Sequence, residues 1–440
     1  MSPSPHHRIQ VNPNLTLQDR LVLNGLLDDI NARETKEKLK EVGQSENEHV
    51  GNGSVVNQVG LPKDQDLITH LRSLNNPNHH SFQPTIFQTF DISPHSLSTN
   101  PILRTYTRLA TKIIRDPKDI VIFTHLLLYF STSLPSTIYL YKNFTYLHGM
   151  IHTLMQIWYA GAYTLLKHQH IHMSGVLIKS FPWNIIDQTF PYIFDPLHGH
   201  TWNSYYYHHV KHHHIESNGP NDLSSTIRYQ RDSISHFLQY WARFFFLIWI
   251  DLPLYFLRKN KPISAFKALF WEISNYFTIY FLYTINTRAT IFTLVIPLVV
   301  MRLGLMIGNW GQHAFVDDIN PNSDYRSSIT LIDVSSNRFG FNDGYHTSHH
   351  LNPRRHWRDH PVSFMEGKKK YSDEKALVFT NIDYLMITFT LLRKDYKKLA
   401  KCLVPIGEEQ MKMSLEEIEA MLESKTAAFN EDKIKEKFKS

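Results

Sequence analysis

The chain carries its densest run of histidines at residues 207–216, which read Tyr207-His208-His209-Val210-Lys211-His212-His213-His214-Ile215-Glu216. Five of the seven positions from His208 to His214 are imidazoles, a density that surface exposure does not explain. Histidine is the commonest metal ligand among side chains, and one ion needs only a few of them. Because long apolar stretches lie on both sides of the run, it predicts a metal site at a membrane.

Two further groups of histidines have helical spacing. His168 and His172 follow the apolar stretch that precedes the run, and His346 and His350 lie beyond the last such stretch. Side chains four residues apart lie on one face of a helix, so each pair can converge on a metal ion. His209 and His213 repeat this spacing, and which neighbours complete their site stays open. The expected metal ligands are His168, His172, His209, His212, His213, His214, His313, His346, His349 and His350.

Polar residues near these groups are expected to orient the ligands. A carboxylate that accepts the free ring N–H of a histidine fixes its tautomer and strengthens it as a ligand. The candidates for this role are Asn309, Glu216, Asp222 and Asp343. Cys402 is the only cysteine, so neither a disulfide framework nor a thiolate cluster is available. The metal must therefore be held by nitrogen and oxygen.

The apolar residues are crowded into the middle of the chain. A membrane-spanning helix needs about 20 mostly apolar residues. Five windows come close to this length, at 119–141, 146–166, 237–257, 268–285 and 289–308. The net charge of +6 does not indicate nucleic-acid binding, because the basic residues form no stripe with interleaved aromatics. Anionic lipid headgroups are the better partner.

The number of crossings follows from where the histidines must meet. Three windows separate the histidines at 168–214 from those at 313–350, and three crossings would place them on opposite faces of the membrane. One window must therefore not cross, and 237–257 is the natural choice, since it contains Arg243, Asp251 and Pro253. Basic residues before the first and third crossings predict that both termini and every histidine group are cytosolic.

We therefore expect an all-α membrane protein with about four transmembrane helices, one interfacial helix and a cytosolic helical cap that carries a di-metal histidine site. Residues 1–100 are predicted to be a polar, partly disordered N-terminal region in which only Leu15 to Val42 has helical periodicity. Residues 101–360 form the membrane domain, and 361–440 a cytosolic C-terminal helical region. The N-terminus has no apolar core after a basic stretch, so no cleavable signal is expected.

At these histidines the chain resembles the integral-membrane fatty acid desaturase and hydroxylase superfamily, whose members carry three histidine boxes. The resemblance covers roughly residues 105–360, with boxes at His168–His172, His209–His214 and His346–His350 and with His313 as an extra ligand. It implies two non-haem iron ions with O2 as co-substrate. The chain lacks a His-Pro-Gly-Gly haem signature, so electrons are expected from a separate cytochrome-b-type haem protein and its reductase.

The resemblance implies an O2-dependent desaturase that introduces a double bond into a fatty acyl or related lipid chain, in the endoplasmic reticulum. An acyl methylene has no polarised bond, so only activated oxygen can remove its hydrogen. One alternative is a hydroxylase or ketolase that acts on a sterol, sphingoid base or carotenoid. Another is a metal-binding membrane transporter or receptor, which would need ionisable residues within the spans, where the sequence offers almost none.

Overall fold

Helices form most of the molecule, as the sequence predicts. The structure is a computed structural model that describes residues 9, 15–46, 61–87, 90–91, 93–332 and 340–438. Two small sheets occur in these residues, which the all-α prediction missed: β1 (Thr85–Phe87) pairs antiparallel with β2 (Phe90–Asp91), and β3 (Ile329–Ile332) pairs parallel with β4 (Leu377–Thr380). Both strands of the second sheet are fully buried, so it serves as part of the core.

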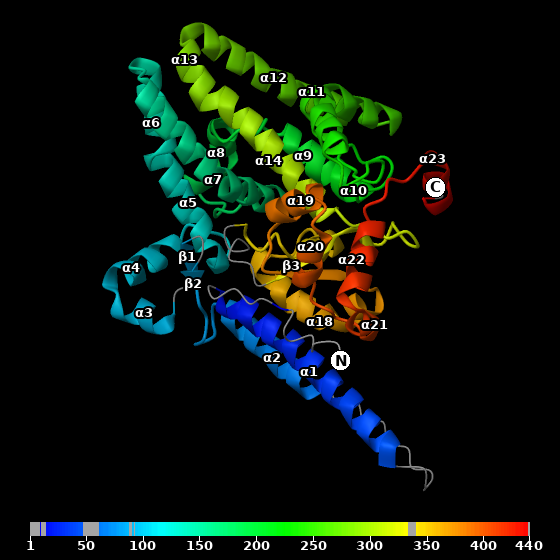
Figure 1. Cartoon of the computed structure of the whole chain (residues 1–440). Coiled ribbons are helices and arrows are strands. Elements are labelled where there is room, and N and C mark those ends of the chain that lie inside the picture. Colours follow the sequence, from blue (N-terminus) through cyan, green and yellow to red (C-terminus); the bar gives the residue numbers. More distant parts are fainter. Residues whose placement is uncertain are drawn as a thin grey trace.

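All five apolar windows are helical, and these helices fill the upper part of Figure 1. They are α5 (Ile120–Ser131) with α6 (Ser133–Lys142), α7 (Tyr146–Met173), α11 (Ile234–Arg258), α12 (Pro262–Ile285), and α13 (Thr287–Thr290) continued through a π-helical turn (Ile291–Val295) into α14 (Ile296–Gln312). In the described residues three continuous helices are long and apolar enough to cross a membrane, Pro117–Lys142, Ile234–Arg258 and Thr287–Gln312. The helix predicted to be interfacial is therefore one of the three.

Helices α7 and α12 are long but more polar, at 28 and 24 residues. Both nevertheless expose large apolar side chains: Trp158 of α7 is 68% exposed and Phe277 of α12 is 67% exposed. Contiguous apolar surface of this kind is rare on soluble monomers and is typical of a surface that contacts lipid. The helical layer therefore has the surface of a membrane protein.

The helices of this layer contain more ionisable groups than the sequence prediction allowed. Glu272 of α12 and Arg302 of α14 form a buried ion pair, and the Tyr276 hydroxyl lies 2.7 Å from the Arg302 guanidinium. On α7, His148 and His152 each lie 2.8 Å from the Ser136 hydroxyl of α6. These groups are paired with one another, as polar groups in a membrane must be. The prediction of almost none was wrong because it left out Glu272 as well as the histidines of α7.

Of the remaining elements, α8 (Trp183–Leu197) packs against α14 and α9 (Ser204–His208) packs against α12, and the others form a cap on one end of this layer. The cap consists of α1 (Leu17–Glu46), α2 (Leu61–Asn75), α3 (Pro94–Thr99), α4 (Pro101–Ala110), α10 (His214–Glu216), α15 (Asp324–Ser327), α17 (His346–Leu351), α18 (His360–Asp373), α19 (Tyr384–Leu392), α20 (Tyr396–Cys402), α21 (Glu408–Lys412), α22 (Leu415–Ser424) and α23 (Glu431–Lys437). In Figure 1, α1 and α2 lie side by side at the opposite end of the molecule from α12 and α13.

The cap core joins the two N-terminal helices to α18. Val22 and Leu26 of α1 and Leu71 of α2 are buried in one cluster with Phe364 of α18. The predicted periodic segment from Leu15 is thus a packed helix. On the other side, α19 packs closely on α14, because Gly311 brings the two backbones together. The end of α14 is therefore held by the C-terminal helices.

Candidate metal centre

The first pair of histidines lies on the last turns of α7. His168 and His172 are one turn apart, and their ring centroids are 4.6 Å from each other. His170, between them, points to the other side of the helix, where its Nε2 lies 3.0 Å from the Asp187 carbonyl. The four-residue spacing therefore brought the expected pair together and turned the middle histidine away, as a helix requires.

The run at 207–216 folds differently from the expectation. Residues His209–His213 form a π-helix, in which the backbone repeats at five residues instead of four. The Nε2 atoms of His209 and His214 consequently face each other at 3.0 Å, while the rings of His209 and His213 are 5.6 Å apart. The structure therefore places His209 and His213 in different groups, whereas the spacing argument, which assumed an α-helix, had paired them.

The third group lies on the short helix α17, whose histidines face two ways. His346 and His350 approach each other with their Nε2 atoms 3.0 Å apart, and His346 Nε2 lies 3.3 Å from His313 Nε2. His349 turns to the opposite side, where its Nε2 lies 2.9 Å from His214 Nε2 and 3.1 Å from His168 Nε2. One helix thus contributes to both halves of the site.

Nine of the ten predicted ligands gather into two clusters. The first cluster is His168, His172, His209, His214 and His349, and the second cluster is His213, His313, His346 and His350. Within each cluster the ligand atoms lie within 4.8 Å of one another. The clusters are neighbours, since the rings of His213 and His350 both lie 5.4 to 5.7 Å from the ring of His214. His212, the tenth residue, lies apart in a group with His208 and Asp222.

The nitrogen spacing in both clusters fits metal ions. Metal–imidazole bonds of about 2.1 Å place adjacent ligand nitrogens roughly 2.9 to 3.4 Å apart at bond angles of 90 to 109°. The nitrogen pairs in the clusters are separated by 2.9 to 3.3 Å. His172 Nε2 is buried without a hydrogen-bond partner, so it too is available to an ion. The residues present therefore fit two ions.

Burial keeps these imidazoles neutral. It lowers the pKa of His209, His214 and His349 well below the ordinary histidine value, and neighbouring imidazoles lower it further. The pKa of His172 is lowered to about 4 by burial, helped by the nearby charge of Arg354. A histidine binds a metal ion only through an unprotonated ring nitrogen. The imidazoles of the clusters can therefore bind metal ions at neutral pH without first losing a proton.

Of the residues expected to orient the ligands, Asp222 contacts a cluster directly. Its Oδ2 lies 2.7 Å from His213 Nδ1, which leaves His213 Nε2 free for the ion. Sequence reasoning missed two further contacts. The Ser327 carbonyl lies 2.9 Å from His313 Nδ1, within hydrogen-bond distance, and the Asp324 carboxylate lies 3.4 Å from His350 Nδ1 without forming a hydrogen bond. Neither has a sequence signal, because both lie on the short helix α15, which reaches the site only through the fold.

The other three candidates form hydrogen bonds or ion pairs with residues that belong to neither cluster. Glu216 accepts from the Tyr255 hydroxyl at 2.7 Å and pairs with Lys259. Asn309 donates to the Ser224 carbonyl at 2.8 Å. Asp343 accepts from Gln312 at 2.7 Å, and burial raises its pKa to about 7 despite that hydrogen bond. Asp343 is therefore a carboxyl group that is partly protonated at neutral pH.

A cavity of about 520 Å³, the main cavity, opens on both clusters. His168 and His209 of the first cluster and His213 and His346 of the second lie on its wall. Away from the metal end the cavity runs between α7 and α14 and is lined by Ile157, Ala160, Gly161, Leu165, Val300, Met301, Gly304, Leu305 and Gly308. Its shape and apolar lining suit a hydrocarbon chain that reaches the metal centre.

The family model "Fatty acid desaturase" matches residues 144–364, half of the chain, and this match includes every histidine of both clusters. The chain belongs to the fatty acid desaturase family. The resemblance inferred from the histidine boxes is thus confirmed, and the family implies an oxidoreductase that modifies lipids. No curated protein and no solved structure matches the chain.

Proposed function

We propose that this member of the desaturase family is a membrane-bound, O2-dependent di-iron enzyme that introduces a double bond into a fatty acyl or related lipid chain. The observation that carries the proposal is the joint position of the two histidine clusters at one end of the main cavity. An apolar chain in that cavity would present its methylenes to both ions.

In this proposal one iron ion is held by the first cluster and one by the second. Imidazole-rich sites without thiolate suit divalent metals of intermediate softness, and the family favours iron among these. The bound ions would activate O2, a chemistry that no side chain supplies. The chain's own residues contribute neutral imidazoles, the hydrogen bond from His213 to Asp222, and apolar walls that hold the substrate.

The contacts of α11 support an interfacial position for this helix. Tyr240, near its start, donates to the Ser224 carbonyl at 3.2 Å, and Tyr255, near its end, donates to Glu216 at 2.7 Å. Glu216 is the last residue of α10, which begins at the ligand His214, and Ser224 lies in the loop that follows, so both ends of α11 reach the metal-bearing face. We infer that the chain crosses the membrane of the endoplasmic reticulum four times, with both termini and both clusters in the cytosol. In this arrangement residues 101–360 form the membrane domain, and the N- and C-terminal segments form the cap.

The electrons come in this proposal from a separate cytochrome-b-type protein and its reductase. Hydroxylation is the second candidate reaction, because both reactions begin with removal of one methylene hydrogen. The two differ in whether a second hydrogen is removed or hydroxyl is returned. The main cavity admits a chain for either reaction, so product analysis decides between them.

The test is lipid profiling by mass spectrometry, with localisation of double bonds, in cells that express the intact chain. The comparison is a His213→Ala, His349→Ala double variant, which removes one ligand from each cluster. His170→Ala is the matched control, since His170 lies on the same turns of α7 but points away. We expect an unsaturated product from the intact chain and the control and none from the double variant.

Other outcomes separate the alternatives. A hydroxylated product with the same dependence on His213 and His349 would replace desaturation by hydroxylation. The same lipids in all three cell lines, with equal expression, bound metal and a supply of reductant, would contradict the proposal and favour a metal-binding role without oxygen chemistry.

A further inference from the structure

Helix α19 is apolar on its exposed side as well as on its buried side. On the buried side, Thr388 packs against α14, where its hydroxyl donates to the Ile307 carbonyl at 2.8 Å. On the other side lie Leu385, Met386 and Phe389, the α19 face, which are 40 to 47% exposed. A helix that is hydrophobic all round is usually buried in a protein core or in a membrane. The α19 face therefore needs an apolar partner.

The α19 face continues the apolar surface of the helical layer. Figure 1 shows α19 at the end of α14, where the layer meets the cap. The start of α11 also lies here, because Lys394, which follows α19, pairs at 3.4 Å with Asp232, which precedes α11. Ile234 and Leu238 in the first turns of α11 are exposed. The α19 face and the start of α11 are therefore adjacent parts of the apolar surface at the edge of the layer.

Basic residues follow α19 directly. Residues 393–401 contain one acidic residue, Asp395, and five basic residues, Arg393, Lys394, Lys397, Lys398 and Lys401. All five basic residues are exposed. Asp395 caps α20, since its carboxylate accepts from the Lys398 N–H at 3.0 Å. An apolar helix face beside exposed lysines and arginines is typical of a segment that lies at the surface of an anionic membrane.

We propose that α19 and the basic residues after it bind the bilayer surface, with the α19 face among the acyl chains and the basic residues at anionic lipid headgroups. An acidic protein partner would account for the basic residues alone and would leave the α19 face in water. The apolar residues therefore favour lipid as the partner. This inference goes beyond the proposed function, because lipid oxidation at the two clusters does not require the C-terminal region to contact lipid.

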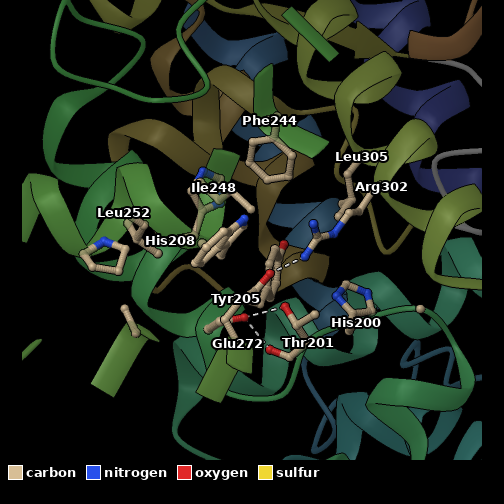
Figure 2. Close-up of a pocket in the computed structure, with 15 residues that line it drawn as sticks. His200, Thr201, Tyr205, His208, Phe244, Ile248, Leu252, Glu272, Arg302 and Leu305 are labelled. Carbon is tan, nitrogen blue, oxygen red and sulfur yellow. Dashed lines mark hydrogen bonds and ion pairs between the residues drawn. The ribbon is translucent and has the colours of Figure 1, made fainter. Parts of the chain in front are cut away.

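The position of α19 also concerns the main cavity. Leu385 belongs to the α19 face and lines the main cavity, so a bilayer-bound α19 would bring this wall of the cavity to the lipid surface. Figure 2 shows a smaller cavity, which shares Phe244 and Leu305 with the main cavity. Its volume is about 40 Å³, room for a water molecule, and the ion pair of Glu272 and Arg302 lies on its wall. The smaller cavity therefore does not admit a hydrocarbon chain.

The experiment makes use of the single cysteine of the chain, Cys402. In a Cys402→Ser background, Phe389→Cys or Met386→Cys carries a nitroxide label, and the full-length protein is reconstituted in bilayer discs of phosphatidylcholine with phosphatidylserine. Electron paramagnetic resonance compares collisions of the label with O2, which concentrates in lipid, and with a water-soluble nickel chelate. Phe277→Cys on α12 is the control in lipid, and Ala420→Cys, exposed on α22, is the control in water.

We expect both labels on the α19 face to collide more often with O2 than with nickel, as in the Phe277→Cys control and opposite to the Ala420→Cys control. Labels that behave like the Ala420→Cys control would overturn the proposal and leave the α19 face to a protein partner.

The role of anionic headgroups is tested by omitting phosphatidylserine, which should shift the collisions of the Phe389→Cys label toward nickel. Charge reversal by Lys397→Glu with Lys398→Glu should remove this difference between the two lipid mixtures. Equal collisions with and without phosphatidylserine in the unreversed protein would overturn the binding of anionic lipid. The readout involves neither metal nor turnover, so it fails or succeeds independently of the proposed function, which is tested by its lipid product.

Discussion

The main cavity gives a sharp prediction at Gly304. A glycine inside a helix costs roughly 1 kcal/mol relative to alanine, so α14 needs a reason to carry glycines at 304 and 308. At both positions a Cβ atom would meet nothing within 4 Å, and both line the cavity. Under the proposed function, we infer that the reason is space for the substrate chain. Gly304→Leu would fill that space with four carbon atoms while improving the helix propensity of α14.

The expected effect depends on the length of the substrate chain. The cavity lining on α14 runs from Val300 to Gln312, about 18 Å at 1.5 Å per residue. Gly304 lies toward the far end, so leucine would displace the last three or four methylenes of a long chain. At about 0.8 kcal/mol per methylene this costs roughly 3 kcal/mol of binding, or about 100-fold. Chains that end before Gly304 should be unaffected.

The assay is the ratio of kcat/KM for a series of acyl chains of increasing length. Val299→Leu is the control, because Val299 lies on the same helix with its side chain exposed on the outer surface. We expect Gly304→Leu to lose activity on the longest chains by about 100-fold and to keep it on the shorter ones. An unchanged chain-length profile at equal metal content would refute the assignment of this cavity to the substrate.

Three further predictions concern stability, measured by thermal unfolding in detergent. Burial raises the pKa of Asp343 to about 7, so the folded protein binds this proton more tightly than the unfolded chain does. The free energy of unfolding should therefore fall as pH rises from about 4 to about 7, by roughly 4 kcal/mol in all. Asp343→Asn should remove that fall, and parallel pH curves for both proteins would contradict the pKa. Glu272→Gln, which leaves Arg302 buried without its charge partner, should cost about 3 to 5 kcal/mol, against under about 1 kcal/mol for Asp251→Asn in an exposed pair. Gly311→Ala should cost about 1 to 3 kcal/mol, because its Cβ would lie 2.6 Å from the Tyr384 carbonyl, and a stability equal to that of Gly308→Ala would argue against this contact.

Spacing in the sequence predicted the site where the backbone is regular. His168 with His172 and His346 with His350 lie on ordinary α-helical turns, and both pairs meet as expected. At His209 the backbone is π-helical, so the ligand partner is five residues away instead of four. A periodicity argument assumes one repeat, and no residue in this run signals the change. The density of histidines was enough to locate the site. Only the backbone conformation shows which histidines belong to which of the two clusters.

The fold could be predicted to the extent that apolar length determines it. Each of the five windows became helical, because each is long and apolar, although two of them are built from more than one helix, α5 with α6 and α13 with α14. The packing of α1 against α18 could not be foreseen, since its buried stripe of Val22, Leu26 and Ile30 is short and lies in a polar segment. The buried pair of Glu272 and Arg302 was also hidden, because two charges far apart in sequence cancel only after α12 and α14 pack together.

The helix α17 explains why the two clusters are expected to form together. His349 belongs to the first cluster, whereas His346 and His350 belong to the second, and all three are held by one helix of six residues. Tyr345, which precedes this helix, donates to Asp19 of α1 at 3.1 Å, so the N-terminal segment also fixes its position. A displacement of α17 would therefore withdraw ligands from both ions at once. Loss of metal from one cluster alone is expected for changes at the end of α7, where His168 and His172 serve the first cluster, or at His313 directly after α14, which serves the second.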